Sequence, residues 1–354
     1  MTKIAVLGAG VMATALTVPL ADNGHDVHLV GTHLDEAIID SIAANHVHPV
    51  LEVEIPSNVI PHQLADAEAA FADAEVVMVG VNSFGIDWAG EQLARLLKPG
   101  QRVIVITKGM RADEDGTLHI LPEVLQAAVG DLAGQVPWAA IVGPSIAGEL
   151  AVRRDTCVNF ASTDLENAEF LAKLFRTSYY HVWPATDFVG CEVGAATKNV
   201  YAFGMGFANG ILEKMGPEAS KKYVMYNYSA ALFGQGSIEL KDFIEMMGGD
   251  RATGDGLGGV GDMWVTSAGG RNVRAGGFVG QGVPFSEVRD VHMKGITLEG
   301  VAAIRVIGEA LEKLTARGVV SAEKFPLCRF LYDIVAKDAP LEVPWDTFYG
   351  GIKN

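Results

Sequence analysis

Residues 4–13 read IAVLGAGVMA and decide the fold of the first half of the chain. The apolar run at residues 4–7 is typical of a strand buried on both faces of a sheet. The six residues after it follow the pattern G-x-G-x-x-A, and a helical stretch follows them. Gly8 allows a tight turn, Gly10 leaves room for a pyrophosphate, and Ala13 lets helix and strand pack closely. This pattern predicts a dinucleotide-binding turn at a helix N-terminus.

Further apolar runs recur at the spacing of a βαβ chain, with amphipathic segments such as 88–97 between them, at residues 27–30, 76–81, 103–106 and 139–142. The alternation predicts a doubly wound, mostly parallel sheet of the Rossmann type. Ligands bind beyond the carboxyl ends of such strands. We therefore expect Ser83, Lys108 and Ala147, which follow three of these strands, to lie around one crevice. There, Lys108 is either a site residue or an ordinary surface lysine.

Cofactor choice stays open at this point. The second strand ends in Val30-Gly31-Thr32-His33, without the acid typical of NAD sites or the Arg typical of NADP sites. Asp35 and Glu36 come a few residues late. Thr32 and His33 suit a 2′-phosphate or a helix cap equally well.

Composition excludes several classes of function. The 354 residues are 49% apolar and 20% charged, which is typical of a compact enzyme, and a net charge of −16 disfavours nucleic acid or anionic membrane as a partner. The three cysteines, Cys157, Cys191 and Cys328, lack the spacing of a metal site or a disulfide framework. No apolar run reaches the length of a membrane helix and no signal peptide precedes the first strand. We expect a cytoplasmic protein without a bound metal.

The strand pattern stops near Asp187, after two more candidate strands at 158–161 and 180–183. We expect a dinucleotide-binding domain at residues 1–187 and a helical substrate and catalytic domain at 188–354. Residues 191–210, CEVGAATKNVYAFGMGFANG, suggest one helix of about five turns. Its glycines fit if another backbone or a ligand comes close. Lys198 within it is either a surface charge or an amine kept for chemistry.

A glycine-rich segment at 248–282 carries the motifs GDMWVT (261–266) and GGRN (269–272). Flexible linkers lack such aromatic and charged residues, so this segment predicts a folded loop around a ligand. Arg271 and Asn272 supply planar donors suited to a phosphate.

These motifs together resemble one family, the NAD(P)-dependent glycerol-3-phosphate dehydrogenases, over nearly the whole chain. The matching motifs keep their order: GAGVMA at 8–13, TKGM at 107–110, GPSIAGEL at 143–150, EVGAATKNV at 192–200, GDMWVT, GGRN, and LEGV at 298–301. The resemblance implies an all-α C-terminal domain of the 6-phosphogluconate-dehydrogenase-like type and a homodimer. It also implies interconversion of dihydroxyacetone phosphate and sn-glycerol 3-phosphate, with NAD or NADP as the cofactor.

The resemblance also implies residue roles. Lys198 is the general acid and base, Lys108 polarises the carbonyl, and Asp262 and Thr266 hold the catalytic lysine and the substrate hydroxyls. Substrate contacts fall to Asn199, Arg271 and Asn272. Cofactor contacts fall to Gly8, Gly10, Val11, Met12, Ala13, His33, Ser83, Ala147, Arg271 and Glu299.

Some positions depart from the family pattern and leave alternatives open. Asn82 replaces a common Pro, Ser267 replaces Cys, and residues 221–228 are rich in tyrosine. If those tyrosines line the pocket, the substrate is a longer polyol or ketose phosphate; otherwise they pack between helices or at a dimer surface. Two further alternatives are an enzyme like the ketopantoate reductases or β-hydroxyacid dehydrogenases, and a dinucleotide-binding protein without catalysis. The two lysines and the GGRN motif favour a phosphate-binding enzyme.

Overall fold

The computed structural model describes residues 1–351, which form two compact units. The first unit comprises residues 1–108 and 120–192. The second comprises residues 109–119 and the described part of 193–354. The sequence placed a single boundary after Asp187. The units are instead discontinuous in sequence, because an eleven-residue stretch from the first half of the chain packs with the helical half.

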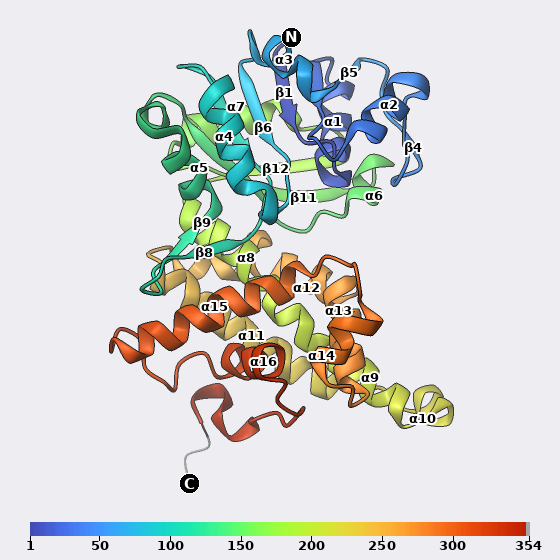
Figure 1. The fold of residues 1–354 in the computed structure, drawn as a ribbon, viewed down its shortest axis with the longest axis vertical. Helices are drawn as coiled ribbons and strands as arrows, with labels where there is room; N and C mark the ends of the chain where they lie inside the picture. Colours follow the sequence, from blue (N-terminus) through green and yellow to red (C-terminus); the bar gives the residue numbers. More distant parts are fainter. Residues whose placement is uncertain (352–354) are drawn as a thin grey trace. The chain divides into compact units, whose positions relative to one another are not determined.

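The first unit is built on an eight-stranded sheet in the order β12-β11-β10-β7-β6-β1-β2-β5 (Figure 1). All neighbouring strands are parallel except β10 and β11. The strands are β1 Lys3–Leu7, β2 Asp26–Val30, β5 Val59–His62, β6 Val76–Val79, β7 Arg102–Val105, β10 Trp138–Val142, β11 Thr156–Ala161 and β12 Tyr180–Ala185. The predicted parallel sheet is confirmed, and every strand predicted from an apolar run is present.

Helices cover both faces of this sheet. Chain order leads outward from β1 to β2 on one side and from β6 through β7 to β10 on the other. Right-handed crossovers in opposite directions place their helices on opposite faces. In agreement, α1 packs with α6 and α7, whereas α4 packs with α3 and α5. The helices are α1 Val11–Asp22, α2 Glu36–Asn45, α3 Ala67–Phe71, α4 Ile86–Leu96, α5 Leu121–Val129, α6 Ala147–Ala151 and α7 Leu165–Phe175.

Two short elements of the first unit have no strong sequence signal. Strand β5 lies at the edge of the sheet and pairs with β2 alone. It contains Pro61, and proline is tolerated in edge strands because it has no N–H to donate to a second neighbour. A two-stranded hairpin, β3 Val47–His48 with β4 Val53–Glu54, follows α2. Both elements are too short for a periodic pattern to predict them.

The second unit is helical (Figure 1). The long helix α8, Phe188–Met205, begins in the first unit and continues into the second. The helices after it are α9 Phe207–Lys214, α10 Pro217–Lys222, α11 Tyr226–Met246, α12 Asp262–Ser267, α13 Arg271–Gly280, α14 Phe285–Glu287, α15 Glu299–Ala316 and α16 Pro326–Lys337. Helix α15 buries an apolar stripe formed by Val301, Ile304, Ile307, Leu311 and Leu314.

Helices α8 and α9 pack backbone to backbone against α13. A methyl group added at Gly206 would lie 1.9 Å from the carbonyl oxygen of Val273, and one added at Gly210 would lie 1.8 Å from that of Gly277. From the α13 side, a methyl group at Gly276 would lie 1.9 Å from the carbonyl oxygen of Phe203. The expectation that these glycines admit another backbone is confirmed.

The same contact corrects the predicted single helix over residues 191–210. Helix α8 ends at Met205 and α9 begins at Phe207, with Gly206 between them. At Gly206 the α-helical hydrogen bond to the fourth residue back is replaced by a 3-10 bond, in which its N–H donates to the carbonyl oxygen of Phe203, three residues back. Close approach of the α13 backbone accompanies this break.

A second small hairpin pairs β8 Met110–Ala112 with β9 Leu118–Ile120. It contains the residues 109–119 that belong to the second unit. Its tip packs on α15, because a methyl group at Gly116 would lie 2.9 Å from the carbonyl oxygen of Ala310. Arg317 also donates to the carboxylate of Asp115 at 2.8 Å. The second unit is therefore helical apart from this hairpin.

Glu239 of α11 ties α16 to the core of the second unit. The carboxylate is 1% exposed and accepts from Tyr201, Gln235 and the backbone N–H groups of Leu327 and Cys328. Those two N–H groups belong to the first turn of α16, which lacks a capping side chain of its own. Burial raises the pKa of Glu239 to about 7, although the four hydrogen bonds act in the opposite direction.

The adjacent glycines of α13 provide a matched test of the backbone packing. Gly276→Ala should lower the free energy of unfolding by about 2–3 kcal/mol, because the methyl group overlaps a carbonyl oxygen that cannot move alone. Gly277→Ala places its methyl group 3.7 Å from the nearest atom and should be neutral or stabilising by up to about 1 kcal/mol. Urea denaturation of both variants measures the difference. Equal effects at the two positions would contradict the packing described above.

Candidate functional site

The glycine-rich turn of the first unit connects β1 to α1 and has the geometry expected of a dinucleotide site. Gly8 has φ +106°, and a methyl group there would lie 3.0 Å from the carbonyl oxygen of Gly80. Gly80 in turn has no room for a side chain, since a methyl group would lie 2.4 Å from Cβ of Ala13. Gly10 precedes α1 without a capping side chain, so the first N–H groups of the helix stay available for phosphate.

Asp35 is fixed against this turn. One oxygen, Oδ2, accepts from the N–H of Ala9 at 3.1 Å, from the N–H of Thr32 at 2.9 Å and from the Thr32 hydroxyl at 2.8 Å. Asp35 stands at the N-cap of α2 but does not cap it. The sequence placed this acid too late in the chain for the cofactor, whereas the fold brings its carboxylate to the end of β2 and to the glycine turn.

The other predicted residues of the first unit follow β2, β6, β7 and β10. His33 is exposed and contacts Trp88 edge-on, with ring centroids 5.5 Å apart. Ser83 begins a short 3-10 turn that Asn82 caps through the N–H groups of Phe84 and Gly85. The Asn82 side chain thus organises the loop after β6. Val11, Met12 and Ala147 begin helices α1 and α6.

Lys108 follows β7 directly and is half-buried. Its ammonium group donates to the carbonyl oxygen of Gly143, the residue after β10, at 3.3 Å. The neighbouring Thr107 hydroxyl binds the carbonyl oxygen of Val81 at 2.6 Å. These contacts place Lys108 at the carboxyl edge of the sheet, as predicted.

Glu192, in the part of α8 that belongs to the first unit, was not singled out as a site residue in the sequence. It is 1% exposed, and its Oε2 atom has no hydrogen-bond partner within residues 1–351. Burial raises the pKa of Glu192 to about 8, and the positive charge of Lys108 acts in the opposite direction. The sequence does offer one signal for Glu192, since it is an acid within a run of small and apolar residues, which indicates burial.

The second unit brings Lys198 and Asp262 together as a buried ion pair. Lys198 of α8 is 7% exposed, Asp262 is 1% exposed, and the ammonium group donates to Oδ1 of Asp262. The surface alternative for Lys198 is therefore wrong. A nearby carboxylate favours the charged ammonium form of a buried lysine, which is the form that donates a proton.

Glycines allow this pair to form. A methyl group at Gly194 would lie 2.7 Å from the carbonyl oxygen of Gly258, so α8 and the glycine-rich segment touch through their backbones. Residues Leu257–Gly261 form a π-helical turn with a kink at Gly259. Helix α12 begins directly after this turn, with Asp262 as its first residue. Such turns are frequent at functional sites.

Of the remaining predicted residues of the second unit, Thr266 lies near the end of α12, Asn199 lies within α8, and Asn272 is the second residue of α13. The Thr266 hydroxyl donates to the backbone of Asp262 at 2.8 Å, four residues back. Asn272 accepts from the N–H of Gly300 at 3.1 Å. A methyl group at Gly300 would also lie 2.5 Å from the carbonyl oxygen of Asn199. The starts of α13 and α15 thus meet α8 one residue after Lys198.

Arg271 begins α13 and Glu299 begins α15. The Arg271 side chain is exposed. Gly270, with φ +102°, precedes it, and no side chain caps α13. This helix start therefore combines available N–H groups with an exposed guanidinium group, a combination that suits a phosphate.

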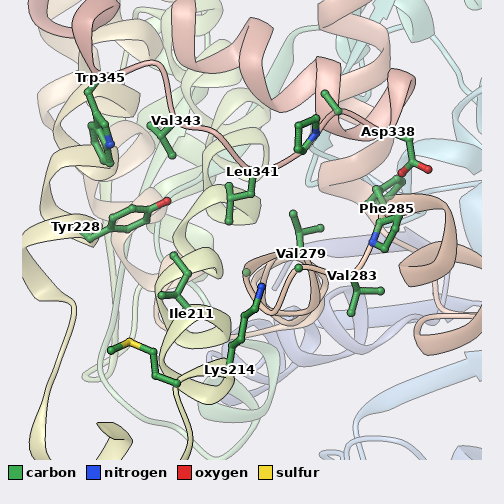
Figure 2. A pocket seen from close by; sticks show the side chains of 16 residues that line it. Ile211, Lys214, Tyr228, Val279, Val283, Phe285, Asp338, Leu341, Val343 and Trp345 are labelled. Atoms are coloured by element: carbon green, nitrogen blue, oxygen red, sulfur yellow. The ribbon is translucent and has the colours of Figure 1, made fainter.

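The tyrosine-rich segment lies elsewhere in the second unit. Tyr223 and Tyr226 are 52% and 74% exposed. Tyr228 lines a groove of about 640 Å³ whose walls also include Ile211, Lys214, Leu341 and Trp345 (Figure 2). None of the predicted site residues lines this groove. The structure therefore gives no support to a substrate pocket built from these tyrosines.

Within residues 1–351, no helix has both the length and the apolar character needed to cross a membrane. No group of three or more His, Cys, Asp or Glu side chains in the same range is arranged to hold a metal ion.

Comparison with known families covers most of the chain. Residues 3–168 match the model of the NAD-dependent glycerol-3-phosphate dehydrogenase N-terminus. Residues 187–345 match the model of the C-terminus of the same family.

Named relatives and a solved structure agree with these matches. An Archaeoglobus fulgidus protein named NADP(+)-dependent glycerol-3-phosphate dehydrogenase is 34% identical, over 94% of this chain and 90% of its own. A Bacillus cereus protein named glycerol-3-phosphate dehydrogenase [NAD(P)+] is 32% identical, over 95% and 92%. The crystal structure of glycerol-3-phosphate dehydrogenase from Coxiella burnetii has a TM-score of 0.77 at 27% identity and covers 95% of each chain.

Glu192 gives the stability of the protein a distinctive pH dependence. Its pKa rises from 4.5 in the unfolded chain to about 8 in the folded one, so the folded state holds the extra proton between these values. Stability from this group is present below pH 4.5 and is lost as pH rises toward 8. Glu192→Gln should gain stability relative to wild type over this range, by at most about 1.4 kcal/mol per pH unit.

Urea denaturation at pH 5, 6, 7 and 8 measures this effect. Exposed Glu166 of α7 provides the control, because Glu166→Gln should leave the pH profile unchanged. A wild-type profile that stays parallel to that of Glu192→Gln would show that Glu192 is ionised in the folded protein.

Proposed function

This chain belongs to the NAD-dependent glycerol-3-phosphate dehydrogenase family, and we propose that Lys198 is the general acid and base of its reaction. The reaction is the NAD(P)-dependent interconversion of dihydroxyacetone phosphate and sn-glycerol 3-phosphate. The buried pair of Lys198 with Asp262 carries the proposal, because a buried lysine held by a carboxylate is a proton donor in a fixed position.

The first unit fits the cofactor. The positive φ of Gly8, the missing side chains of Gly8, Gly10 and Gly80, and the uncapped start of α1 form a cradle for a pyrophosphate. When bound, NAD(P)H supplies a hydride. The protein's part is to hold the dinucleotide through the first N–H groups of α1, with Ser83 and Ala147 as further contacts from the loops after β6 and β10.

Lys198 completes the reduction of the ketone. As hydride adds to the carbonyl carbon, the carbonyl oxygen takes a proton from the Lys198 ammonium group and becomes the hydroxyl of the product. In the reverse direction, the neutral amine accepts that proton. Asp262 keeps the ammonium group in place throughout, and Thr266 is proposed to contact the substrate hydroxyls from the same helix.

Arg271 and Asn272 hold the substrate phosphate in this proposal. They are the first two residues of α13, whose start has no capping side chain. Asn272 is held in place by the hydrogen bond it accepts from the N–H of Gly300. Arg271 and Glu299 are also proposed to contact the cofactor, and Lys108 is proposed to polarise the substrate carbonyl. We further propose a homodimer in the cytoplasm, on the resemblance to the family.

Turnover of dihydroxyacetone phosphate with purified protein tests the proposed function. NADH and NADPH are supplied in parallel, and cofactor oxidation is followed by absorbance. We expect kcat on the order of 1 per second or faster with one of them. Cofactor binding without turnover of dihydroxyacetone phosphate would contradict the proposed substrate.

Lys198→Ala tests the proposed role of the ion pair. Loss of a general acid should lower kcat on the order of 10³-fold. Binding of NADH should persist, because the cofactor cradle lies in the first unit. Lys294→Ala, at an exposed lysine of the same unit, serves as the control and should keep wild-type turnover. Unchanged turnover in Lys198→Ala removes Lys198 from the mechanism.

A further inference from the structure

We infer that the first unit selects NAD(H) over NADP(H), with Asp35 as the residue that recognises the free 2′-hydroxyl of the adenosine ribose. The inference rests on the proposed function only in taking the glycine-rich turn as the cofactor site. It goes beyond the family assignment, which leaves the choice between NAD and NADP open.

The position of Asp35 is the first observation. In a Rossmann-type domain the adenosine ribose lies beyond the end of the second strand, beside the glycine-rich turn. Asp35 binds both structures at once, through Ala9 of the turn and Thr32 after β2. All three hydrogen bonds go to Oδ2, so among the described residues 1–351 Oδ1 is left to accept from a ribose hydroxyl. Asp35 comes a few residues late in sequence, but the fold brings it beside the end of β2.

The start of α2 is the second observation. A helix N-terminus attracts phosphate, and α2 begins beside the expected ribose. Here, however, the N-cap is Asp35 and the first helical residue is Glu36, with Asp40 one turn further on. The carboxylates of Asp35 and Glu36 already balance the positive end of the helix. A 2′-phosphate arriving there would meet like charge.

The charge of the surrounding sequence is the third observation. Residues 4–94 contain 13 Asp or Glu and no Lys or Arg. This segment includes β1, α1, β2, α2, β5 and β6, the elements nearest the expected adenosine. A 2′-phosphate is normally bound by Arg or Lys at the end of the second strand, and this segment offers only histidines.

Four cations of the first unit, Lys3, Arg102, Arg153 and Lys108, lie away from the carboxyl end of β2. Lys3 and Arg102 are the first residues of β1 and β7, at the amino ends of the strands. Arg153 binds Asp22, which ends α1 at the opposite end from the glycine turn. Lys108 lies at the carboxyl edge but follows β7, which β6 and β1 separate from β2.

The chemistry of the two cofactors makes this arrangement selective. The 2′-hydroxyl of NAD donates a hydrogen bond to a carboxylate, whereas the 2′-phosphate of NADP has no proton to donate when fully ionised and carries negative charge. Like charges in one site cost several kcal/mol, so NADH should bind on the order of 100-fold more tightly than NADPH. The inference separates this chain from its Archaeoglobus fulgidus relative, which is named for NADP(+).

Direct binding tests the inference without relying on turnover. Isothermal titration calorimetry measures the dissociation constants of NADH and NADPH for the full-length protein. The same measurement with 5′-AMP and adenosine 2′,5′-bisphosphate isolates the effect of the 2′-phosphate. We expect NADH and 5′-AMP to bind more tightly than their 2′-phosphorylated counterparts, by similar factors.

Two substitutions then locate the cause. Asp35→Asn keeps an oxygen acceptor for Ala9 and Thr32 but removes the charge. It should reduce the ratio of the NADPH and NADH dissociation constants about tenfold. Leu34→Arg places a cation next to Asp35 at a side chain that is 79% exposed. It should tighten NADPH binding about tenfold and leave NADH binding nearly unchanged. Thermal unfolding of both variants confirms that the glycine turn stays intact.

Three outcomes would overturn the inference. The first is wild-type binding of NADPH as tight as that of NADH. The second is a gap that persists unchanged in both variants. The third is tight NADPH binding that disappears in His33→Ala, which would make His33 the 2′-phosphate ligand. Strong NADH binding without turnover of dihydroxyacetone phosphate would instead contradict the proposed substrate and leave the cofactor preference standing.

Discussion

The buried ion pair of Lys198 and Asp262 imposes the main constraint on the second unit. Removing two charges from water costs several kcal/mol for each ion, and their mutual attraction offsets this cost only in a good geometry. That geometry depends on backbone contacts, because Gly194 and Gly258 let α8 approach the segment that carries Asp262. A larger residue at Gly194 would collide with the backbone of Gly258 and push α8 away from this segment. The small residues around Lys198 are therefore part of the arrangement that buries this ion pair.

Three buried carboxyl groups show three ways in which the fold stabilises an acid. Asp262 is paired with a cation, and Glu239 receives four hydrogen bonds from donors that include the start of α16. Glu192 has one oxygen without any partner in residues 1–351, and burial raises its pKa to about 8. The first two acids each hold a neighbouring element in place through their partners. At Glu192, burial favours the protonated form, and the positive charge of Lys108 opposes it.

Much of the first unit could be predicted from sequence, because buried parallel strands and the G-x-G-x-x-A turn have strong local signals. Every predicted strand is present, and the turn has the backbone that its glycines require. Features set by distant contacts could not be predicted. Asp35 reaches the turn only because the loop after β2 folds back, and the break at Gly206 coincides with the close approach of α13. Lys198 was ambiguous for the same reason, since its partner is 64 residues away.

The hairpin at residues 109–119 has a consequence for the order in which the chain folds. The ribosome releases this hairpin early, together with the strands of the first unit, but its packing partners Ala310 and Arg317 are made about 200 residues later. Until then the hairpin has no surface of the second unit to pack on. The hairpin in the first half of the chain therefore stays unpacked until α15 has been synthesised. Expression of residues 188–354 alone would give α15 an uncovered face, because the hairpin that packs on it would be missing.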